Sequence, residues 1–343
     1  MHLFLTADDS QDLLINELRR LYPAADVATA GPTLVVAKRI WSRPEEARPL
    51  VFSRQLLPDA KMMGAVSITN FATILCDLIA AQIEASQPWA FQVFPHYGSA
   101  KAGWHRCELV RKVCLSRLGA CRGLIQNLQE QPVSWSRAHS LVRLMLTAPD
   151  RGFLSVVTAP NLWHLRSLIS PFPDGEIPVA VDKSAPSRAF AKLLEAELRL
   201  GRSIQTGQTC VDLGAAPGSW SYVALRRGAR VCAVDRAPLR EDLMIHPGLI
   251  FRRGDAFAFA PEHPVDWLLC DVIAMPERTI GLLLEWTRRR RMRHFVVTIK
   301  FKGATDYAKL DRLNAAMPPL CEDFYLTRLC ANKNEVCAFG TVN

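Results

Sequence analysis

The spacing of apolar residues predicts helices and strands in both halves of the chain. In the first half, Leu13, Leu14, Leu18 and Leu21 fall on one face of a helix over residues 10–21, with Ser10 as its N-cap. Two more helices are expected at 67–87, which Pro88 would end, and at 107–118. Short apolar or alternating runs predict strands at 1–6, 33–37, 50–55, 90–94, 141–147 and 153–158. This mixture is typical of an α+β region.

The second half of the chain shows a stricter alternation of strands and helices. Residues 170–186 include four prolines and Gly175, which predicts a linker with a domain boundary near 175–185. Beyond it, we expect strands at 209–213, 230–234, 249–253, 265–270, 294–299, 323–329 and 335–340, and helices at 187–200, 220–227, 278–293 and 307–316. Such alternation predicts an α/β, Rossmann-like, doubly wound sheet with helices on both faces. The last two strands follow each other closely, so they should form an antiparallel hairpin at the sheet edge.

The stretch 210–220, CVDLGAAPGSW, contains the first strand of this sheet and the turn after it. Small residues let the backbone approach a ligand closely, and Gly214 and Gly218 tolerate positive φ. A second apolar run ends in Asp235, 23 residues after Asp212, where a carboxylate can accept from both hydroxyls of an adenosine-type ribose. The turn lacks the G-x-G-x-x-G spacing that cradles a pyrophosphate. The sequence therefore favours an S-adenosylmethionine site over a nicotinamide dinucleotide site.

Charged residues stand at the ends of predicted strands, where open α/β sheets bind their ligands. Asp271 and Lys300 follow consecutive core strands, and Glu335 opens the final strand. Lys192 lies in the helix before the first strand, where on its own it would be interpreted as a solvated residue.

These residue types suit the methylation of an alcohol. A hydroxyl such as the ribose 2′-OH is a poor nucleophile and must lose its proton as it attacks. A lysine accepts that proton only in its neutral form, which a second positive charge and partial burial both favour. Lys192 could supply this charge to Lys300, while Asp271 and Glu335 hold the ammonium groups and the hydroxyl in place.

The same residues resemble a known family. The segments SRAFAKL, DLGAAPGSW, AVD, GDAF, CDV, TIK and NEV, within residues 185–340, are similar to the FtsJ-type ribose 2′-O-methyltransferases. The resemblance implies a Lys-Asp-Lys-Glu tetrad of Lys192, Asp271, Lys300 and Glu335, with Lys300 as general base. It also implies an S-adenosyl-L-methionine site lined by Ser187, Gly214, Ala216, Pro217, Gly218, Ser219, Trp220, Asp235, Asp255 and Asp271.

Within that site, Asp255 would meet the adenine amino group. The chain departs from the family pattern at Ser219, where a second glycine is usual, and at Ala274-Met275-Pro276, which follows Asp271 less tightly than the usual Asp-Met-x-Pro.

The layout of the chain is closest to family members that methylate a cytidine ribose in bacterial 23S rRNA. This implies a ferredoxin-like domain over 1–60, a THUMP-like RNA-binding domain over 61–175 and a Rossmann-like methyltransferase domain over 185–343. The expected activity is the S-adenosylmethionine-dependent 2′-O-methylation of a ribose in 23S rRNA. We expect a cytoplasmic protein that is a monomer or a weak oligomer.

The charge of the chain also points to a polyanionic partner, since its net charge is +9 and its pI about 9.2. Basic residues concentrate in 101–143, with a tryptophan near each end: Lys101, Trp104, Arg106, Arg111, Lys112, Arg117, Arg122, Trp135, Arg137 and Arg143. Cations can track phosphates and aromatic rings can stack on bases, but a solvated basic helix with core tryptophans has the same pattern. A second run, Arg288 to Arg291 with Arg293, ends a predicted helix, where cations also complement the helix dipole.

The ten cysteines include no C-x-x-C pair. Cys107, Cys114 and Cys121 share one predicted helix face, so we expect buried, reduced thiols rather than a metal or redox site. No long apolar segment opens the chain, and the most apolar window, 72–83, is short and includes Asp77. Neither a signal peptide nor a membrane span is predicted.

Several other functions remain open at this point. The chain could methylate another RNA target, such as a tRNA or mRNA ribose or an RNA base, or it could methylate a small molecule. It could also be an RNA-binding protein with a vestigial methyltransferase fold, although the presence of all four tetrad positions and Asp235 disfavours this. A nicotinamide dehydrogenase is disfavoured by the missing third glycine.

Overall fold

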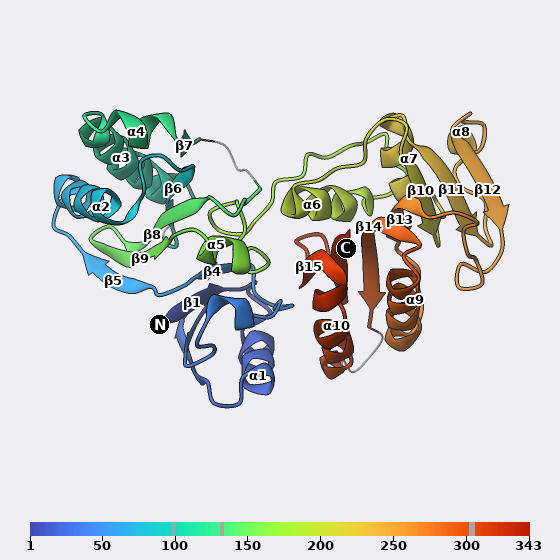
Figure 1. The fold of residues 1–343 in the computed structure, drawn as a ribbon, viewed down its shortest axis with the longest axis horizontal. Coiled ribbons are helices and arrows are strands. Elements are labelled where there is room, and N and C mark those ends of the chain that lie inside the picture. Colours follow the sequence, from blue (N-terminus) through green and yellow to red (C-terminus); the bar gives the residue numbers. More distant parts are fainter. Residues whose placement is uncertain (98–99, 131–133, 302–305) are drawn as a thin grey trace. The chain divides into compact units, whose positions relative to one another are not determined.

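The computed structural model describes residues 1–97, 100–130, 134–301 and 306–343. The chain forms two compact units, Met1–Glu176 (unit 1) and Ile177–Asn343 (unit 2), shown in Figure 1. The division between them falls inside the proline-containing stretch 170–186.

Unit 1 begins with a four-stranded antiparallel sheet of order β2-β3-β1-β4. Its elements are β1 (His2–Leu5), α1 (Gln11–Leu21), β2 (Asp26–Gly31), β3 (Leu34–Lys38), the short helix η1 (Pro44–Glu46) and β4 (Gln55–Leu57). Helix α1 buries Leu14 and Leu18, as its apolar spacing predicted. The sequence missed β2, an edge strand with most of its side chains exposed and therefore no apolar alternation.

The strand predicted at 50–55 is wrong over most of its length, because β4 begins only at Gln55. Leu50, Val51 and Phe52 are buried, which explains the apolar run. The N–H groups of Val51 and Phe52 donate to the carboxylate of Glu17 in α1, at 2.8 and 3.2 Å. This buried segment thus satisfies its backbone with a side chain instead of a neighbouring strand.

The rest of unit 1 is built on a five-stranded sheet of order β5-β9-β8-β6-β7. Its strands are β5 (Lys61–Gly64), β6 (Trp89–Pro95), β7 (Leu128–Gln129), β8 (Ser140–Ala148) and β9 (Arg151–Val157), and its helices are α2 (Ile68–Gln82), α3 (Ala100–Leu118), α4 (Arg122–Gln126) and α5 (Asn161–His164). Helices α2 and α3 pack against each other, and α3 packs on β6. The helix predicted at 67–87 ends at Gln82 because Ile83 is already extended, so Pro88 does not set its end.

The two sheets of unit 1 share one apolar cluster. Leu3 and Leu57 of the first sheet pack with Phe94, Met145 and Phe153 of the second. The division of this unit into domains 1–60 and 61–175, and the ferredoxin-like and THUMP-like names for them, stay predictions.

Two of the basic and tryptophan side chains in the stretch 101–143 are buried. Arg143 and Trp135 are 1% and 7% exposed, and the Trp135 Nε1–H group donates to the Ile169 carbonyl oxygen at 2.8 Å. Of the two alternatives for this stretch, these two residues therefore fit core side chains and not an RNA-binding surface. Trp104 is 37% exposed, and the side chain of Lys101 lies outside the described residues.

All ten cysteines are free thiols. Cys107 and Cys114 are buried as expected. Cys121 is exposed, because α3 ends at Leu118 and the expected helix face does not continue to residue 121. No group of side chains in the described ranges could hold a metal ion.

Unit 2 contains a seven-stranded sheet of order β12-β11-β10-β13-β14-β16-β15. The first five strands are parallel, and β16 pairs antiparallel with both β14 and β15. The strands are β10 (Thr209–Leu213), β11 (Arg230–Asp235), β12 (Leu249–Arg253), β13 (Val265–Cys270), β14 (Met292–Lys300), β15 (Cys321–Thr327) and β16 (Glu335–Val342). The predicted α/β sheet and its antiparallel hairpin at the edge are both confirmed.

Helices cover both faces of this sheet (Figure 1). The helical elements are α6 (Phe190–Leu200), α7 (Ser219–Arg226), α8 (Glu241–Met244), α9 (Pro276–Arg288), η2 (Tyr307–Leu310), α10 (Asp311–Ala316) and η3 (Pro318–Leu320). Helices α6 and α7 bury Leu193 and Val223 in one cluster with Ala233, Leu269 and Phe339 of the sheet. Because side chains alternate along a strand, residues of the opposite parity face the other side, where α9 packs on β14.

Helix α9 ends five residues earlier than the sequence predicted. It was expected to continue to Arg293, but it stops at Arg288, and β14 starts at Met292. The arginines in between provide no apolar periodicity that would mark the end of the helix. Since β10, β11, β13 and β14 are parallel, their carboxyl ends meet at one edge of the sheet, next to Gly214, Asp235, Asp271 and Lys300.

Candidate active site

The turn between β10 and α7 requires glycine at two positions. Gly214 has φ of 72°, and a Cβ atom there would lie 2.9 Å from Val272 Cα. Gly218 has φ of 108° and is the N-cap of α7, where a Cβ would lie within 2.4 Å of a Leu243 methyl group. Only glycine adopts these φ values without strain. Gly214 lets the turn approach Val272, just after β13, and Gly218 leaves room for Leu239 and Leu243.

Asp235, at the end of β11, ties this turn to the next strand. Its Oδ2 atom accepts from the Ala216 N–H at 3.0 Å, and its Oδ1 atom accepts from the Ala237 N–H at 2.9 Å. Each carboxylate oxygen has a further lone pair, so the side chain can still accept from two hydroxyls of a ligand.

Two cavities lie along the carboxyl edge of the sheet and share four lining residues. The first, of about 310 Å³, is lined by Ser187, Ala189, Asp212, Gly214, Ala215, Ala216, Pro217, Ser219, Trp220, Asp235, Asp271, Val272, Ile273 and Lys300. The second, of about 220 Å³, is lined by Gly214, Asp235, Arg236, Gly254, Asp255, Ala256, Phe257, Val272, Ile273 and Arg278. We call the two together the carboxyl-edge hollow.

The carboxyl-edge hollow contains nine of the ten residues expected at the cofactor. Gly218 is the exception: its position faces Leu239 and Leu243, so it shapes the turn without lining the hollow. A carboxylate at Asp235 and another at Asp255, with a narrow space between, suit a ligand that carries a ribose diol and an amino-substituted purine. This donor set fits an adenosine-type cofactor.

Asp255 is also held by two arginines. Its Oδ2 atom accepts from Arg236 and Arg278, each at 3.2 Å, and its Oδ1 atom accepts from the Phe257 N–H at 2.9 Å. The Phe257 N–H group, together with the two guanidinium groups, holds the pKa of Asp255 below its usual value. Arg278 also stacks on the Phe257 ring, 3.9 Å from the centroid. Sequence reasoning missed Arg278, for which the spacing of residues gave no signal.

Ser219, which replaces the usual second glycine, is a buried residue at the start of α7. Its hydroxyl lies 2.7 Å from the Ser187 hydroxyl, and the Trp220 indole N–H donates to the Ala189 carbonyl oxygen at 2.8 Å. These bonds tie the first turn of α7 to the segment that leads into α6. The serine therefore fits here as a connection between two segments and does not displace the turn.

Four charged side chains converge beside the first cavity, whose lining includes two of them, Asp271 and Lys300. The other two are Lys192 and Glu335. Lys192 Nζ lies 3.2 Å from both Asp271 carboxylate oxygens and 2.5 Å from Glu335 Oε1. Lys300 Nζ lies 3.0 Å from Asp271 Oδ1 and donates to the Asp271 backbone carbonyl at 2.6 Å. We call these four side chains the lysine–carboxylate cluster, and Asp271 is at its centre.

The fold accounts for this convergence. Lys300 and Glu335 are paired in register across β14 and β16, so the last residue of one strand faces the first residue of the other. Lys192 extends from α6, which packs on β16. Burial lowers the pKa of Lys192, but the charges of Asp271 and Glu335 outweigh burial and raise it above its ordinary value. Lys192 is therefore a permanent cation at neutral pH.

Two further residues support the cluster, and sequence reasoning did not single them out. The Thr298 hydroxyl donates to Asp271 Oδ1 at 2.5 Å, and the Asn332 amide donates to Glu335 Oε1 at 3.1 Å. The position of Thr298, two residues before Lys300 on a strand, could have revealed it, because the two share one face. Asn332 lies in a loop and had no such signal.

Sequence reasoning also did not single out Asp212, which is buried and lines the hollow. Burial raises its pKa to about 7, even though the Ser221 N–H and hydroxyl groups stabilise the carboxylate at 3.0 and 2.7 Å.

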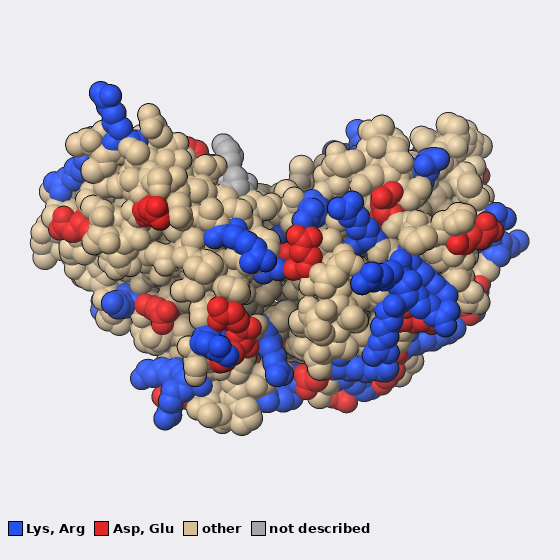
Figure 2. Space-filling model, in the orientation of Figure 1, with Lys and Arg blue, Asp and Glu red and all other residues tan. Residues whose placement is uncertain are grey.

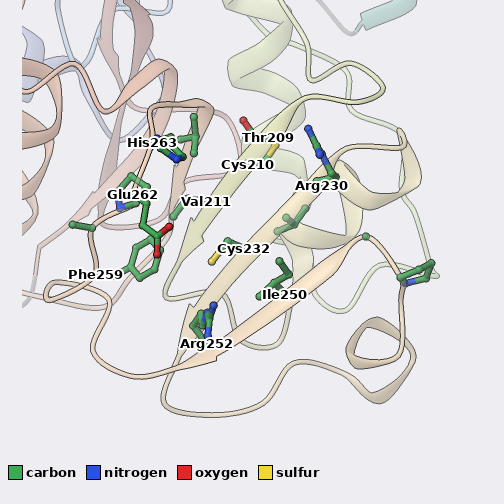
Figure 3. Close-up of a pocket in the computed structure, with 16 residues that line it drawn as sticks. Thr209, Cys210, Val211, Arg230, Cys232, Ile250, Arg252, Phe259, Glu262 and His263 are labelled. Carbon is green, nitrogen blue, oxygen red and sulfur yellow. The ribbon is translucent and has the colours of Figure 1, made fainter.

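A larger cavity, of about 700 Å³, lies elsewhere on the unit 2 sheet (Figure 3). Side chains of β10, β11 and β12, including Cys232, Ile250 and Arg252, face it together with Phe259 and His263. The connection 254–264, which the structure describes throughout, forms no helix that would cover this face. None of the residues predicted for the site lines this cavity.

Comparison with known proteins finds a family match for part of the site. Residues 185–292 match the family described as FtsJ-like methyltransferase. The protein named "Ribosomal RNA large subunit methyltransferase M" from Laribacter hongkongensis is 38% identical over 164 residues, which are 46% of this chain and 45% of the relative. The protein of that name from Azoarcus sp. is 29% identical over 271 residues, 76% of this chain and 67% of the relative.

Most of these alignments are partial: the chain spans about half the length of the curated relatives it matches, as with the protein of that name from Pseudomonas putida F1 (49%). Among solved structures, the crystal structure of TrmN from Thermus thermophilus is 17% identical, with a TM-score of 0.33 and coverage of 99% of both chains. No helix within the described residues is long and apolar enough to cross a membrane. Residues 185–292, which include the turn, Asp235, Lys192 and Asp271, are an FtsJ-like methyltransferase domain.

Proposed function

We propose that this chain is an S-adenosylmethionine-dependent RNA ribose 2′-O-methyltransferase that acts on large-subunit ribosomal RNA. The observation that carries the proposal is the lysine–carboxylate cluster, which lies against the carboxyl-edge hollow of a methyltransferase domain. Two lysines and two carboxylates at one end of an adenosine-type site are suited to deprotonating and holding a hydroxyl group.

The carboxyl-edge hollow would hold the methyl donor. Asp235 would accept from the ribose hydroxyls, Asp255 from the adenine amino group, and Gly214 would allow the backbone to approach the ligand closely. When bound, S-adenosylmethionine supplies a methyl group on a sulfonium sulfur, which is a good leaving group. The protein chiefly aligns the acceptor and removes its proton.

The lysine–carboxylate cluster would receive the acceptor ribose. Lys300, in its neutral form, would accept the 2′-hydroxyl proton as the new oxygen–carbon bond forms. Lys192 would remain charged between Asp271 and Glu335, and its positive charge would lie near Lys300 and the acceptor oxygen. Asp271, which touches both lysines and Thr298, would fix the distance between them.

The choice of RNA substrate rests on relatives and on sequence resemblance. The names of the relatives state a large-subunit rRNA methyltransferase, and the resemblance points to a cytidine ribose in 23S rRNA. The N-terminal half would bind RNA through its ferredoxin-like and THUMP-like regions, in the cytoplasm, as a monomer or weak oligomer.

The sharpest test is the change Lys300→Ala. It should lower methyl transfer to a 23S rRNA transcript by about 100- to 10,000-fold, the range expected for loss of a general base. Calorimetry should show S-adenosylmethionine bound as tightly as by the unchanged protein. The control Arg312→Ala removes an exposed basic residue of the same unit and should keep full activity. A fully active Lys300→Ala protein would exclude Lys300 as the base.

A second experiment separates the proposed reaction from other methyl transfers. Tritiated methyl groups are transferred to 23S rRNA, tRNA and mRNA transcripts, and the labelled atom is mapped by digestion to nucleosides. The proposal requires the label on a ribose of 23S rRNA. Label on a base would indicate a base methyltransferase, and label on tRNA or mRNA alone would change the substrate. Calorimetry without detectable S-adenosylmethionine binding would favour an RNA-binding protein with a vestigial site.

A further inference from the structure

Five arginines lie at the junction of α9 and β14, from the last residue of α9 to the second residue of β14: Arg288, Arg289, Arg290, Arg291 and Arg293. We call them the amino-edge arginine cluster, because β14 begins at this edge of the sheet. Four of them are exposed, and Arg291 is half-buried. Figure 2 shows Lys and Arg side chains gathered over α9.

Acidic side chains neutralise only part of this charge. Glu285 pairs with Arg289 at 3.5 Å and with Arg291 at 3.2 Å. Arg288, Arg290 and Arg293 have no acidic partner within 4 Å among the residues that the structure describes. The cluster thus presents five positive charges against one carboxylate, and three guanidinium groups are available to an external anion.

The backbone at Arg290 gives an independent reason to expect a role for this side chain. Arg290 has φ of 50°, in the left-handed region that favours glycine. The Arg291 N–H donates to the Trp286 carbonyl and the Arg290 N–H to the Thr287 carbonyl, both at 3.0 Å. This is the bonding of a Schellman motif, which usually has glycine at the position of Arg290.

The end of α6 in the same unit has the usual glycine in the left-handed conformation. Gly201 has φ of 67° there, and the Arg202 N–H donates to the Glu197 carbonyl at 3.2 Å. The two helices therefore end in similar turns, one with glycine and one with arginine. An arginine in the left-handed conformation raises the free energy of the folded backbone. A favourable interaction of its charge with a ligand would offset this.

The amino-edge arginine cluster is remote from the reacting groups. Met292 and Lys300 are the first and last residues of β14, so they lie about 26 Å apart at the usual rise per residue of a strand. A ligand of the carboxyl-edge hollow cannot reach the cluster, whereas a folded RNA that extends past the sheet can.

We propose that the amino-edge arginine cluster binds the phosphodiester backbone of the RNA substrate at a point remote from the methylated ribose. The inference rests on the proposed function for the identity of the polyanion. Arginine forks match phosphate oxygens bidentately, and phosphate contacts of this kind orient an RNA without reading its sequence. The cluster therefore contributes to affinity for long RNA and not to the chemical step.

The test compares two triple variants that lose the same charge. One is Arg288→Gln/Arg289→Gln/Arg293→Gln, and the control changes the exposed unit 2 residues Lys183, Arg230 and Arg312 to Gln. Dissociation constants for an in vitro 23S rRNA transcript are measured over a range of salt concentrations. The cluster variant should bind at least about tenfold more weakly and show a salt slope smaller by about 2–3, since each lost phosphate contact removes close to one unit.

Two further readouts distinguish a binding surface from a structural role. Binding of S-adenosylmethionine and of an oligonucleotide of a few residues should not change in the cluster variant. Arg290→Gly should raise the melting temperature, because glycine relieves the left-handed backbone, and should nevertheless weaken transcript binding several-fold. RNA affinity and salt slope equal to those of the control would overturn the proposal, and an acidic protein partner would become the alternative.

These binding measurements do not depend on methyl transfer. If the unchanged protein methylates no RNA but the cluster variants still lose affinity, the proposed function fails and the surface stands. If methylation is found and the variants bind as the control does, the surface fails and the proposed function stands.

Discussion

Within the described residues, each unit buries one lysine or arginine side chain that the sequence would place at the surface. Arg143 of unit 1 is 1% exposed and Lys192 of unit 2 is 8% exposed. Arg143 donates to Gln92 Oε1 at 2.8 Å, to the Leu56 carbonyl at 3.3 Å and to the Ser170 carbonyl. All three acceptors are neutral. Lys192 instead lies between two carboxylates.

The two cations differ in their partners, and we propose that they also differ in role, with Arg143 structural and Lys192 functional. Burial lowers the pKa of Arg143 to about 9, and no carboxylate compensates, so this residue joins β8 to β4 and to the segment around Ser170 at an electrostatic cost. Around Lys192, the carboxylates of Asp271 and Glu335 raise the pKa despite burial. A cation held by neutral oxygens fixes the geometry of the fold, whereas a cation held by carboxylates in a cluster can take part in proton chemistry.

The strongest challenge to this comparison is Lys192→Met, which keeps the length of the side chain but removes its charge. Methyl transfer should fall by about 100- to 1,000-fold, the cost of losing an electrostatic partner at a reacting centre. Kinetics with a 23S rRNA transcript would measure it. Lys309→Met, which breaks the exposed pair with Glu277, is the matched control and should keep its activity. Full activity of Lys192→Met would make Lys192 another structural cation.

The opposite result is expected for Arg143→Met. Three acceptors lose their donor, so the free energy of unfolding should fall by about 3 kcal/mol. Urea unfolding followed by tryptophan fluorescence would show this, and activity per folded molecule should stay unchanged. Arg143→Lys keeps the charge without the planar fork, so it should recover only part of the stability. A loss of activity in folded Arg143→Met would contradict the structural assignment.

His294 extends the comparison to a buried base that stays neutral. Burial, and then the charges of Arg202 and Arg293, lower its pKa to about 4. Because the folded pKa lies below the ordinary 6.5, the stability it contributes is present above pH 6.5 and is lost as the pH falls towards 4. We expect a loss on the order of 2 kcal/mol over this window, measured by urea unfolding. His294→Phe should be less sensitive to acid, and an unchanged pH dependence would refute the assignment.

The sequence predicted unit 2 and the lysine–carboxylate cluster well, for one physical reason. Parallel strands end at a common edge, so Asp271 and Lys300, each directly after an apolar run, had to lie close together. The alternation of apolar runs also identified every strand of the unit 2 sheet. Asn332 could not be predicted in this way, because it reaches Glu335 from a loop whose path no periodicity determines.

The errors in unit 1 have a different origin. Leu50, Val51 and Phe52 are buried, and burial alone made them resemble a strand, although a carboxylate of α1 satisfies the backbone. Arg143 and Trp135 are polar or amphipathic residues that the fold buries with hydrogen-bond partners far away in sequence. The local pattern of apolar and polar residues shows how apolar a segment is. It does not show which distant group will form hydrogen bonds with the polar atoms of that segment.

The register between β14 and β16 has a consequence for how the chain can tolerate insertions and deletions. Lys300 faces Glu335, and Thr298 faces Cys337, across an antiparallel pair. Removing one residue from β16 would slip this pairing by a single position and turn Glu335 to the opposite face of the sheet. Length changes should therefore be accepted in the hairpin connection only where they leave this pairing intact. The position of Glu335 at the start of β16, where we propose that it takes part in the reaction, thus restricts the length changes that β16 and the connection before it can accept.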